Sequence, residues 1–227
     1  MLETMGVNII KIISRYWALF LEGTKYTLFL AFVTVLFGAI LGSLIAMVKM
    51  SHFKPLSFLG SAYIEIIRGT PLLLQLYFFY FLLPTAFPSL TIFNNKIFCI
   101  SVALILNSAA YVSEIVRSGI QAVDKGQREA SESLGIKSSQ TMIRIILPQA
   151  IKNILPSLGN EFVAVIKETS LASTFFVGDL MTQYKTINTA LYLVIEPLIV
   201  VGVIYFILTF TLSKLIALLE RRLKAGD

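Results

Sequence analysis

Polar residues inside apolar stretches are the features of this sequence best placed to do chemistry. Asn160 and Glu161 lie in the middle of a hydrophobic region that extends from about residue 145 to residue 178. A charged side chain at the centre of a bilayer costs about 2.5–3.5 kcal/mol on insertion scales, so it usually faces a cavity or a charged partner. We therefore take Asn160 and Glu161 as candidates for a polar passage across a membrane.

The position of Glu161 along its predicted helix places it near the midplane of a bilayer. It follows Pro148 by 13 residues, and a helix of that length rises about 20 Å at about 1.5 Å per residue. Substrate sites of transporters concentrate at this depth, where helices are interrupted. The alternative is a structural ion pair of Glu161 with Arg68 or Lys167 that holds two helices together.

A second group of polar residues interrupts the hydrophobic stretch from about residue 56 to residue 83. Glu65 and Arg68 are one helical turn apart, which favours a structural pair between them. Pro71 frees backbone groups and kinks a helix, and Thr70 then becomes a polar lining residue. Glu65, Arg68 and Thr70 are therefore candidate pathway residues as well.

Three further charged residues lie near the ends of apolar stretches. Glu114 and Arg117 have the same three-residue spacing and are predicted to form a structural pair. Glu196, beside Pro197, is an expensive charge for which the sequence offers no account beyond a pair or a position near the interface.

Catalysis by this chain is not expected, because the residues for a catalytic centre are missing. The single histidine, His52, lies in a polar loop, and the single cysteine, Cys99, lies in an apolar run. One residue of each kind cannot build the usual metal sites, disulfides or catalytic triads. The sequence also lacks a glycine-rich GxxxxGK[ST] loop for nucleotide phosphates. We therefore predict no catalytic residue, no metal and no bound cofactor in this chain.

Composition indicates that membrane-spanning helices position these residues. Hydrophobic residues make up 56% of the 227 residues and charged residues 14%, which is too apolar for a soluble domain of this length. A helix needs about 20 apolar residues to cross a bilayer core. Regions that meet this length lie at about 26–48, 56–83, 96–116, 145–178 and 189–219. We expect an all-α membrane protein of about five spans, folded as one domain over residues 1–227.

Two segments outside these spans have patterns of their own. Residues 8–20 mix basic and aromatic residues with isoleucines, which is typical of an amphipathic helix at the membrane interface. Residues 117–144 form the longest polar segment and must lie in water. The Lys49–Lys54 loop, this segment and the C-terminus are basic, so the positive-inside rule places all three in the cytoplasm and the N-terminus outside. The basic residues behind the net charge of +6 therefore indicate which segments face the cytoplasm. We expect no nucleic acid as a partner.

The polar segment is predicted to contain a short helix that begins after Asp124 and ends at Gly135. Asp124 and Gln127 have the spacing of a capping box, and Gly135 can take the left-handed conformation that ends helices. A small charged helix between two spans suits insertion into a partner's cleft better than catalysis. The alternative is a solvated loop helix without a partner.

The residues of this segment resemble the cytoplasmic "EAA" signature of ABC importer permeases. Seven positions within residues 129–148 agree in spacing: Glu129, Ala130, Ser131, Gly135, Ile145, Leu147 and Pro148. Ser131 replaces the second alanine of the pattern by another small residue. Two further groups resemble the polar amino acid subfamily: Tyr63, Glu65, Arg68, Gly69, Thr70, Pro71, Leu72 and Gln75, and Asn160, Glu161, Phe162, Lys167, Thr169, Ser170 and Leu171.

The resemblance implies a type I ABC importer permease fold in a bacterial inner membrane and a set of partners. These are a dimer of ATPase subunits that binds ATP and Mg²⁺, a second permease copy or a paralogous permease, and an extracytoplasmic amino-acid-binding protein. The helix from about Lys125 to Leu134 would lie in a groove of the ATPase and transmit its closure. The coupling residues would be Gly126, Gln127, Arg128, Glu129, Ala130, Ser131, Leu134 and Gly135.

Within this family the substrate depends on what Glu161 contacts. A buried carboxylate is stabilised by a guanidinium or ammonium group and repels an acidic ligand. If Glu161 meets the substrate side chain, arginine, lysine or histidine is predicted, and glutamine, glutamate or cystine is the alternative. A secondary transporter would usually be longer and carry inverted repeats, and a membrane-embedded enzyme would need a catalytic centre, so both are less favoured.

Overall fold

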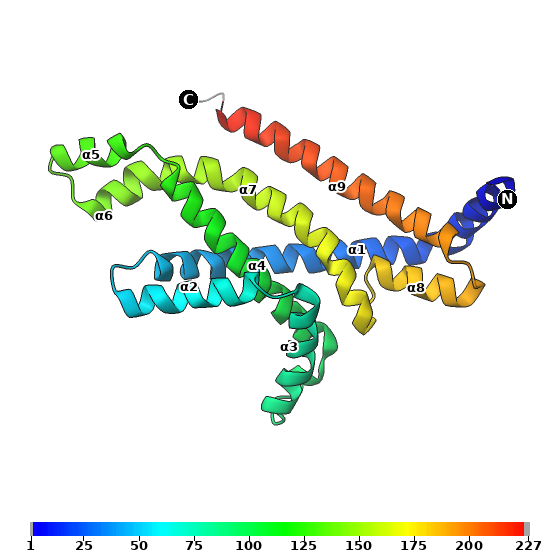
Figure 1. Cartoon of the computed structure of the whole chain (residues 1–227). Helices are drawn as coiled ribbons and strands as arrows, with labels where there is room; N and C mark the ends of the chain where they lie inside the picture. Colours follow the sequence, from blue (N-terminus) through cyan, green and yellow to red (C-terminus); the bar gives the residue numbers. More distant parts are fainter. Residues whose placement is uncertain (1, 225–227) are drawn as a thin grey trace. The chain divides into compact units, whose positions relative to one another are not determined.

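The computed structural model describes residues 2–224, and all regular secondary structure in this range is helical (Figure 1). This confirms the all-α fold. The α-helices are α1 Leu2–Lys49, α2 Lys54–Arg68, α3 Leu72–Ala86, α4 Lys96–Gln121, α5 Lys125–Ser133, α6 Ser138–Thr141, α7 Leu147–Glu168, α8 Leu180–Leu191 and α9 Ile195–Lys224. Short helices of other types are the 3₁₀ helices η1 Thr91–Asn94 and η3 Thr169–Phe175 and the π-helix η2 Met142–Ile146.

The chain divides into two compact units, each assembled from separated segments. Unit 1 comprises residues 1–34, 72–104 and 163–212, and unit 2 comprises residues 35–71, 105–162 and 213–227. The helices α1, α4, α7 and α9 therefore contribute residues to both units. The organisation as one domain stays a prediction.

Unit 1 is built around two apolar clusters. One joins α1, α3, α4 and η3, with Leu30, Leu76 and Ile100 fully or almost fully buried. The other joins the start of α1 to α8 and α9 and is centred on Leu180 and Ile187. Cys99, which lies in an apolar run of the sequence, is 1% exposed and belongs to the buried core.

Unit 2 depends on close approach between helices at small residues. A Cβ at Gly42 of α1 would lie 2.7 Å from the carbonyl oxygen of Ala109, and one at Gly38 would lie 2.9 Å from Oγ of Ser108. Glycines four residues apart let two helix backbones meet in this way. On the other side, a Cβ at Gly60 of α2 would lie 3.1 Å from the backbone nitrogen of Lys49. The ends of α1 and α2 are thus packed tightly within this unit.

The structure shows how two of the predicted elements begin and end. Residues 8–20 are helical, and they form the first part of α1, which continues without a break to Lys49. The predicted span 56–83 is interrupted at the predicted proline: α2 ends at Arg68 and α3 begins at Leu72. The proline at the break cannot donate a helical hydrogen bond and disfavours a helical conformation of the residue before it.

The remaining spans have longer or more interrupted helices than predicted. Within the described residues, α1, α4 and α9 are each long and apolar enough to cross a membrane, and α2 with α3 qualifies only as a broken pair. The predicted count of about five also includes α7, which carries the polar residues Asn153, Asn160 and Glu161. The region 145–178 contains η2, α7 and η3 instead of one continuous helix.

Candidate functional site

The predicted helix in the polar segment is present as α5. Its N-cap is Asp124, whose Oδ1 accepts a hydrogen bond of 2.7 Å from the backbone nitrogen of Gly126. Gly135 has φ +74°, a conformation that a residue with a side chain rarely adopts. These two residues confirm the start and stop that the sequence predicted. Gln127 does not complete a capping box, because its Oε1 lies 3.5 Å from Nε2 of Gln149 in α7.

A buried hydrogen bond between two hydroxyl groups fixes α5 to α6. Oγ of Ser131 and Oγ1 of Thr141 are 2.5 Å apart, and both residues are 2% exposed. Ser131 is the position at which this chain departs from the family signature, so the change introduces a hydroxyl that finds a buried partner. Buried hydroxyl groups generally require such a partner.

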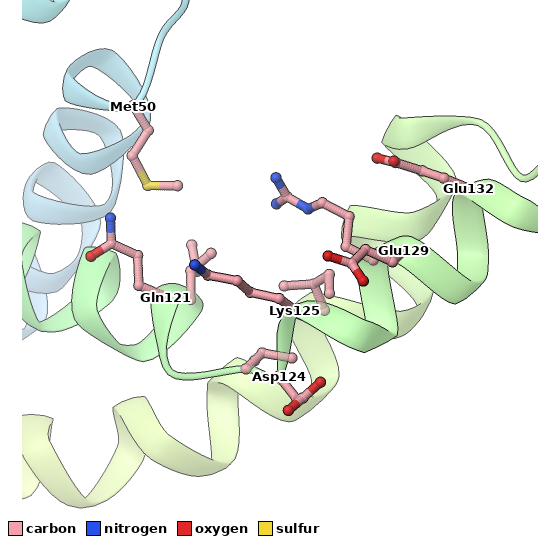
Figure 2. Close-up of a pocket in the computed structure, with 10 residues that line it drawn as sticks. Met50, Gln121, Asp124, Lys125, Glu129 and Glu132 are labelled. Atoms are coloured by element: carbon pink, nitrogen blue, oxygen red, sulfur yellow. The ribbon is translucent and has the colours of Figure 1, made fainter.

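A cavity of about 720 Å³ lies beside α5, and two of the predicted coupling residues, Arg128 and Glu129, line it. Figure 2 shows Met50 and Gln121 on one side and Glu129 and Glu132 on the other. Its lining residues come from the end of α1, the end of α4, α5 and η2: Met50, Ile120, Gln121, Val123, Asp124, Lys125, Arg128, Glu129, Glu132 and Ile146. The wall is therefore rich in charges of both signs.

The other predicted coupling residues lie on the exposed surface of α5 and its C-terminus. Leu134 is 80% exposed. Seven of the eight predicted coupling residues are exposed: Gly126, Gln127, Arg128, Glu129, Ala130, Leu134 and Gly135. Only Ser131 turns inward. The helix thus presents a charged cavity wall and an exposed leucine.

Glu161 is half-buried in α7 and contacts α4. Its Oε1 accepts a hydrogen bond of 2.9 Å from Oγ of Ser108. Ser108 is 1% exposed and packs against Gly38 of α1, so its hydroxyl position is fixed by close helix packing. Asn160 is exposed and lines a separate cavity of about 370 Å³ with Lys152 and Glu220. Asn160 and Glu161, although adjacent in the chain, therefore have different neighbours.

The predicted pair of Glu65 and Arg68 is not formed, and this expectation is corrected. Nη1 of Arg68 lies 3.9 Å from Oε2 of Glu114, and its guanidinium carbon lies 5.2 Å from the ring centre of Tyr111. Glu65 is exposed on α2. Thr70 donates from Oγ1 to the carbonyl oxygen of Ile66 at 2.9 Å, which satisfies a carbonyl near the helix end.

Glu114 lies close to three cationic side chains. The predicted pair with Arg117 is present, with Nη2 at 2.8 Å from Oε2. Nζ of Lys49 lies 2.6 Å from Oε1, a partner that sequence reasoning missed. Lys49 is 65 residues away in the chain, so local spacing contains no signal for this contact.

Two other carboxylates find partners in unit 1. Oε1 of Glu196, unexplained from the sequence, accepts a hydrogen bond of 3.1 Å from Nδ2 of Asn8. Asp179 is fully buried and caps α8: Oδ2 accepts from the nitrogen of Met181 at 3.0 Å and Oδ1 from Oγ1 of Thr182 at 2.5 Å. Sequence reasoning missed Asp179, although an aspartate directly before a helix is a recognisable N-cap signal.

The described residues contain no cluster of three or more His, Cys, Asp or Glu side chains that could hold a metal ion. The site offers charged side chains, hydroxyl groups and backbone dipoles. Such groups bind and orient polar ligands or partners.

Comparison with known proteins assigns the chain to a family. Residues 14–225 match the family model described as binding-protein-dependent transport system inner membrane component. The arginine transport system permease protein ArtQ of Bacillus subtilis is 41% identical over 91% of this chain and 93% of that protein. The probable glutamine ABC transporter permease protein GlnM of the same organism is 38% identical over 95% and 98%.

Solved structures agree with this result. A crystal structure of an amino acid ABC transporter with histidines is 45% identical and covers 92% of this chain and 96% of its own, with a TM-score of 0.86. An inward-facing MetNI methionine ABC transporter shares the fold at 18% identity, with a TM-score of 0.71 over 90% and 98% of the chains. The fold is thus that of a type I ABC importer permease, and the chain belongs to the family of binding-protein-dependent transport system inner membrane components, among the permeases of amino acid ABC transporters.

Proposed function

We propose that this chain is the membrane-spanning subunit of an ATP-driven importer for polar amino acids, with basic amino acids as its substrates. The observation that carries the substrate class is the half-buried carboxylate of Glu161, which Ser108 fixes from α4 at 2.9 Å. A carboxylate held in a partly desolvated site favours an ammonium or guanidinium group. Arginine, lysine and histidine supply such a group.

The relatives support this proposal without deciding between substrates. One is named for arginine, and one solved structure contains histidines. Others are named for glutamine, for L-cystine and for nopaline. Glutamine, glutamate and cystine are therefore the alternative substrates within the same class of importer.

The proposed pathway comprises Glu161, Asn160, Thr70, Arg68 and Glu65. Glu161 would meet the cationic group, and Asn160 and Thr70 would line the route. Arg68 and Glu65 are placed differently from the predicted pair, because Arg68 lies beside Glu114 and Tyr111 and Glu65 is exposed. Arg68 and Glu65 would therefore contribute to the shape and the charge of the pathway.

The proposed partner of α5 is a dimer of ATPase subunits that hydrolyses ATP with Mg²⁺. The exposed Leu134 and the charged wall of the 720 Å³ cavity, with Arg128 and Glu129, form a surface that a protein groove can accept. The complex would further contain a second permease, either a copy or a paralogue, and an extracytoplasmic amino-acid-binding protein. The N-terminus would lie outside and α5 and the C-terminus in the cytoplasm of a bacterial cell.

The test is uptake of labelled arginine, glutamine and glutamate by proteoliposomes that contain the permease, its ATPase and its binding protein, with and without internal ATP. We expect ATP-dependent arginine uptake that unlabelled lysine competes away. Glu161→Gln should reduce this uptake at least about tenfold, since each factor of ten corresponds to 1.4 kcal/mol of lost binding or barrier free energy. Ser108→Ala, which keeps the carboxylate but removes its donor, should have a smaller effect.

Three results would contradict the proposal at different levels. Uptake of glutamine or glutamate alone would overturn the basic substrate class and leave the importer standing. Unchanged arginine uptake by Glu161→Gln would remove Glu161 from the substrate site. Uptake that is independent of ATP and of the ATPase subunit would overturn the ATP-driven mechanism itself.

A further inference from the structure

A row of polar side chains along one face of α4 links the ends of α1 and α2 to the cavity beside α5. Tyr111, Glu114, Arg117 and Gln121 are three or four residues apart, so they lie on one side of the helix. Each of these side chains contacts another residue of the row or a residue of a neighbouring helix. Gln121 ends the row and lines the α5 cavity (Figure 2).

The contacts of this row are short at its centre. Both carboxylate oxygens of Glu114 are used: Oε1 by Lys49 at 2.6 Å and Oε2 by Arg117 at 2.8 Å. Arg117 then donates from Nη1 to Oε1 of Gln121 at 2.7 Å. The row therefore continues by direct hydrogen bonds from the end of α1 to the last residue of α4.

The contact with α2 is looser than the others. Nη1 of Arg68, the last residue of α2, lies 3.9 Å from Oε2 of Glu114 and its guanidinium group covers the ring of Tyr111. Its side chain is 43% exposed, against 18% for Glu114. Three cations thus surround one carboxylate, two at hydrogen-bond distance and one at the limit of an ion pair.

The helices that carry these residues are held independently of the ions. Gly38 and Gly42 pack α1 against α4, Oγ of Ser57 donates to the carbonyl oxygen of Lys49 at 2.6 Å, and the Tyr63 hydroxyl donates to the carbonyl oxygen of Leu106 at 2.6 Å. Removal of the Glu114 charge therefore leaves the helix contacts of this unit in place. What changes is the orientation of Arg117 and Gln121, in the last turn before α5.

We propose that Glu114 is a positioning residue for coupling. Through its contacts with Lys49 and Arg68, it links Arg117 and Gln121 to the ends of α1 and α2. A movement of α5 then displaces these two helices, whereas without the link it would only deform the last turn of α4. The inference rests on the proposed function of α5 as the element that docks on the ATPase.

The experiment compares amino acid uptake with ATP hydrolysis in proteoliposomes that contain the complete transporter. Glu114→Gln should lower the number of amino acids transported per ATP at least about fivefold, the lower end of typical coupling between sites, while ATP hydrolysis continues. Glu114→Asp retains the charge on a shorter side chain and should recover part of the ratio. Glu22→Gln is the matched control, because Glu22 is an exposed acid on α1 in unit 1, and should leave the ratio unchanged.

A second variant tests the row without removing the central charge. Arg117→Lys can keep the ion pair with Glu114 but cannot also reach Gln121 through a guanidinium fork, because a lysine presents a single ammonium group. The same fall in ratio is expected. If Glu114→Gln fails to assemble with the ATPase, Arg117→Lys alone tests whether the row couples ATP hydrolysis to transport.

The inference is overturned if Glu114→Gln and Arg117→Lys keep the wild-type ratio. It is also overturned if uptake and hydrolysis fall in proportion together with thermal stability, since that result describes a merely structural pair. Both outcomes differ from a failure of the proposed function, in which the wild-type complex itself shows no ATP-driven uptake.

Discussion

Glu114 in unit 2 and Asp179 in unit 1 are two shielded carboxylates that are stabilised by opposite means. Glu114 is 18% exposed and has three cations around it, whereas Asp179 is fully buried and accepts hydrogen bonds from backbone nitrogens, that of Met181 among them, and from the Thr182 hydroxyl group. Among the described residues, Asp179 makes no ion pair. Burial raises the pKa of Asp179, and the hydrogen bonds from Thr182 and Met181 oppose that shift.

The difference follows from where each carboxylate lies on its helix. Asp179 precedes α8, where free backbone amides and the helix dipole stabilise an anion without a countercharge. Glu114 lies inside α4, where every backbone amide is already used, so its charge requires side-chain partners. A cap is local and compact, whereas an ion cluster ties together several helices.

The largest effect is expected at the buried cap. Asp179→Ala should lower the free energy of unfolding by about 3 kcal/mol, because it leaves the buried Thr182 hydroxyl and the Met181 amide without their acceptor. The midpoint of SDS-induced unfolding in mixed micelles measures this loss. Asp124→Ala is the matched control: Asp124 caps α5 in the same way but is exposed, and about 1 kcal/mol is expected there. Equal losses would show that burial adds nothing to the cap.

An intermediate effect is expected where α1 packs on α4 near the Glu114 cluster. Gly42→Ala should cost about 2 kcal/mol, because the new Cβ would lie 2.7 Å from the Ala109 carbonyl oxygen and 2.8 Å from Cβ of Val112. Gly202→Ala in α9 has no atom within 4 Å and should stabilise the helix by up to about 1 kcal/mol. Thermal melting in detergent compares the two. A tolerated Gly42→Ala would mean that ions, not packing, hold the end of α1.

The smallest effect is expected for one partner of the ion cluster. Lys49→Met should cost about 1 kcal/mol, because Lys49 is 24% exposed and Arg117 still binds Glu114. The loss should shrink in high salt, which screens partly exposed charges, whereas the loss in Asp179→Ala should not. Unfolding at low and high salt measures both. A salt-independent loss in Lys49→Met would remove the contrast between cluster and cap.

Local sequence signals predicted the elements that depend on neighbouring residues. The start of α5 after Asp124 and its stop at Gly135 follow from capping and backbone freedom, and both are confirmed. The pair of Glu114 and Arg117 is likewise one helical turn apart. The same reasoning failed for Glu65 and Arg68, because Glu114 and Tyr111 of α4 lie within reach of the arginine. Equal spacing cannot tell which of two acids a helix will meet.

The sequence by itself determined that this protein lies in a membrane, that its fold is all-helical and that it carries the signature of its family. Hydropathy, capping and motif spacing are properties of residues that are close together in the chain. Only the tertiary structure decided that Lys49 and Arg68 meet at Glu114, that Ser108 holds Glu161 and that Asp179 is buried. These contacts join residues far apart in the chain or depend on what surrounds them. Their formation follows from how closely helices pack at residues such as Gly38 and Gly42, which a linear pattern does not specify.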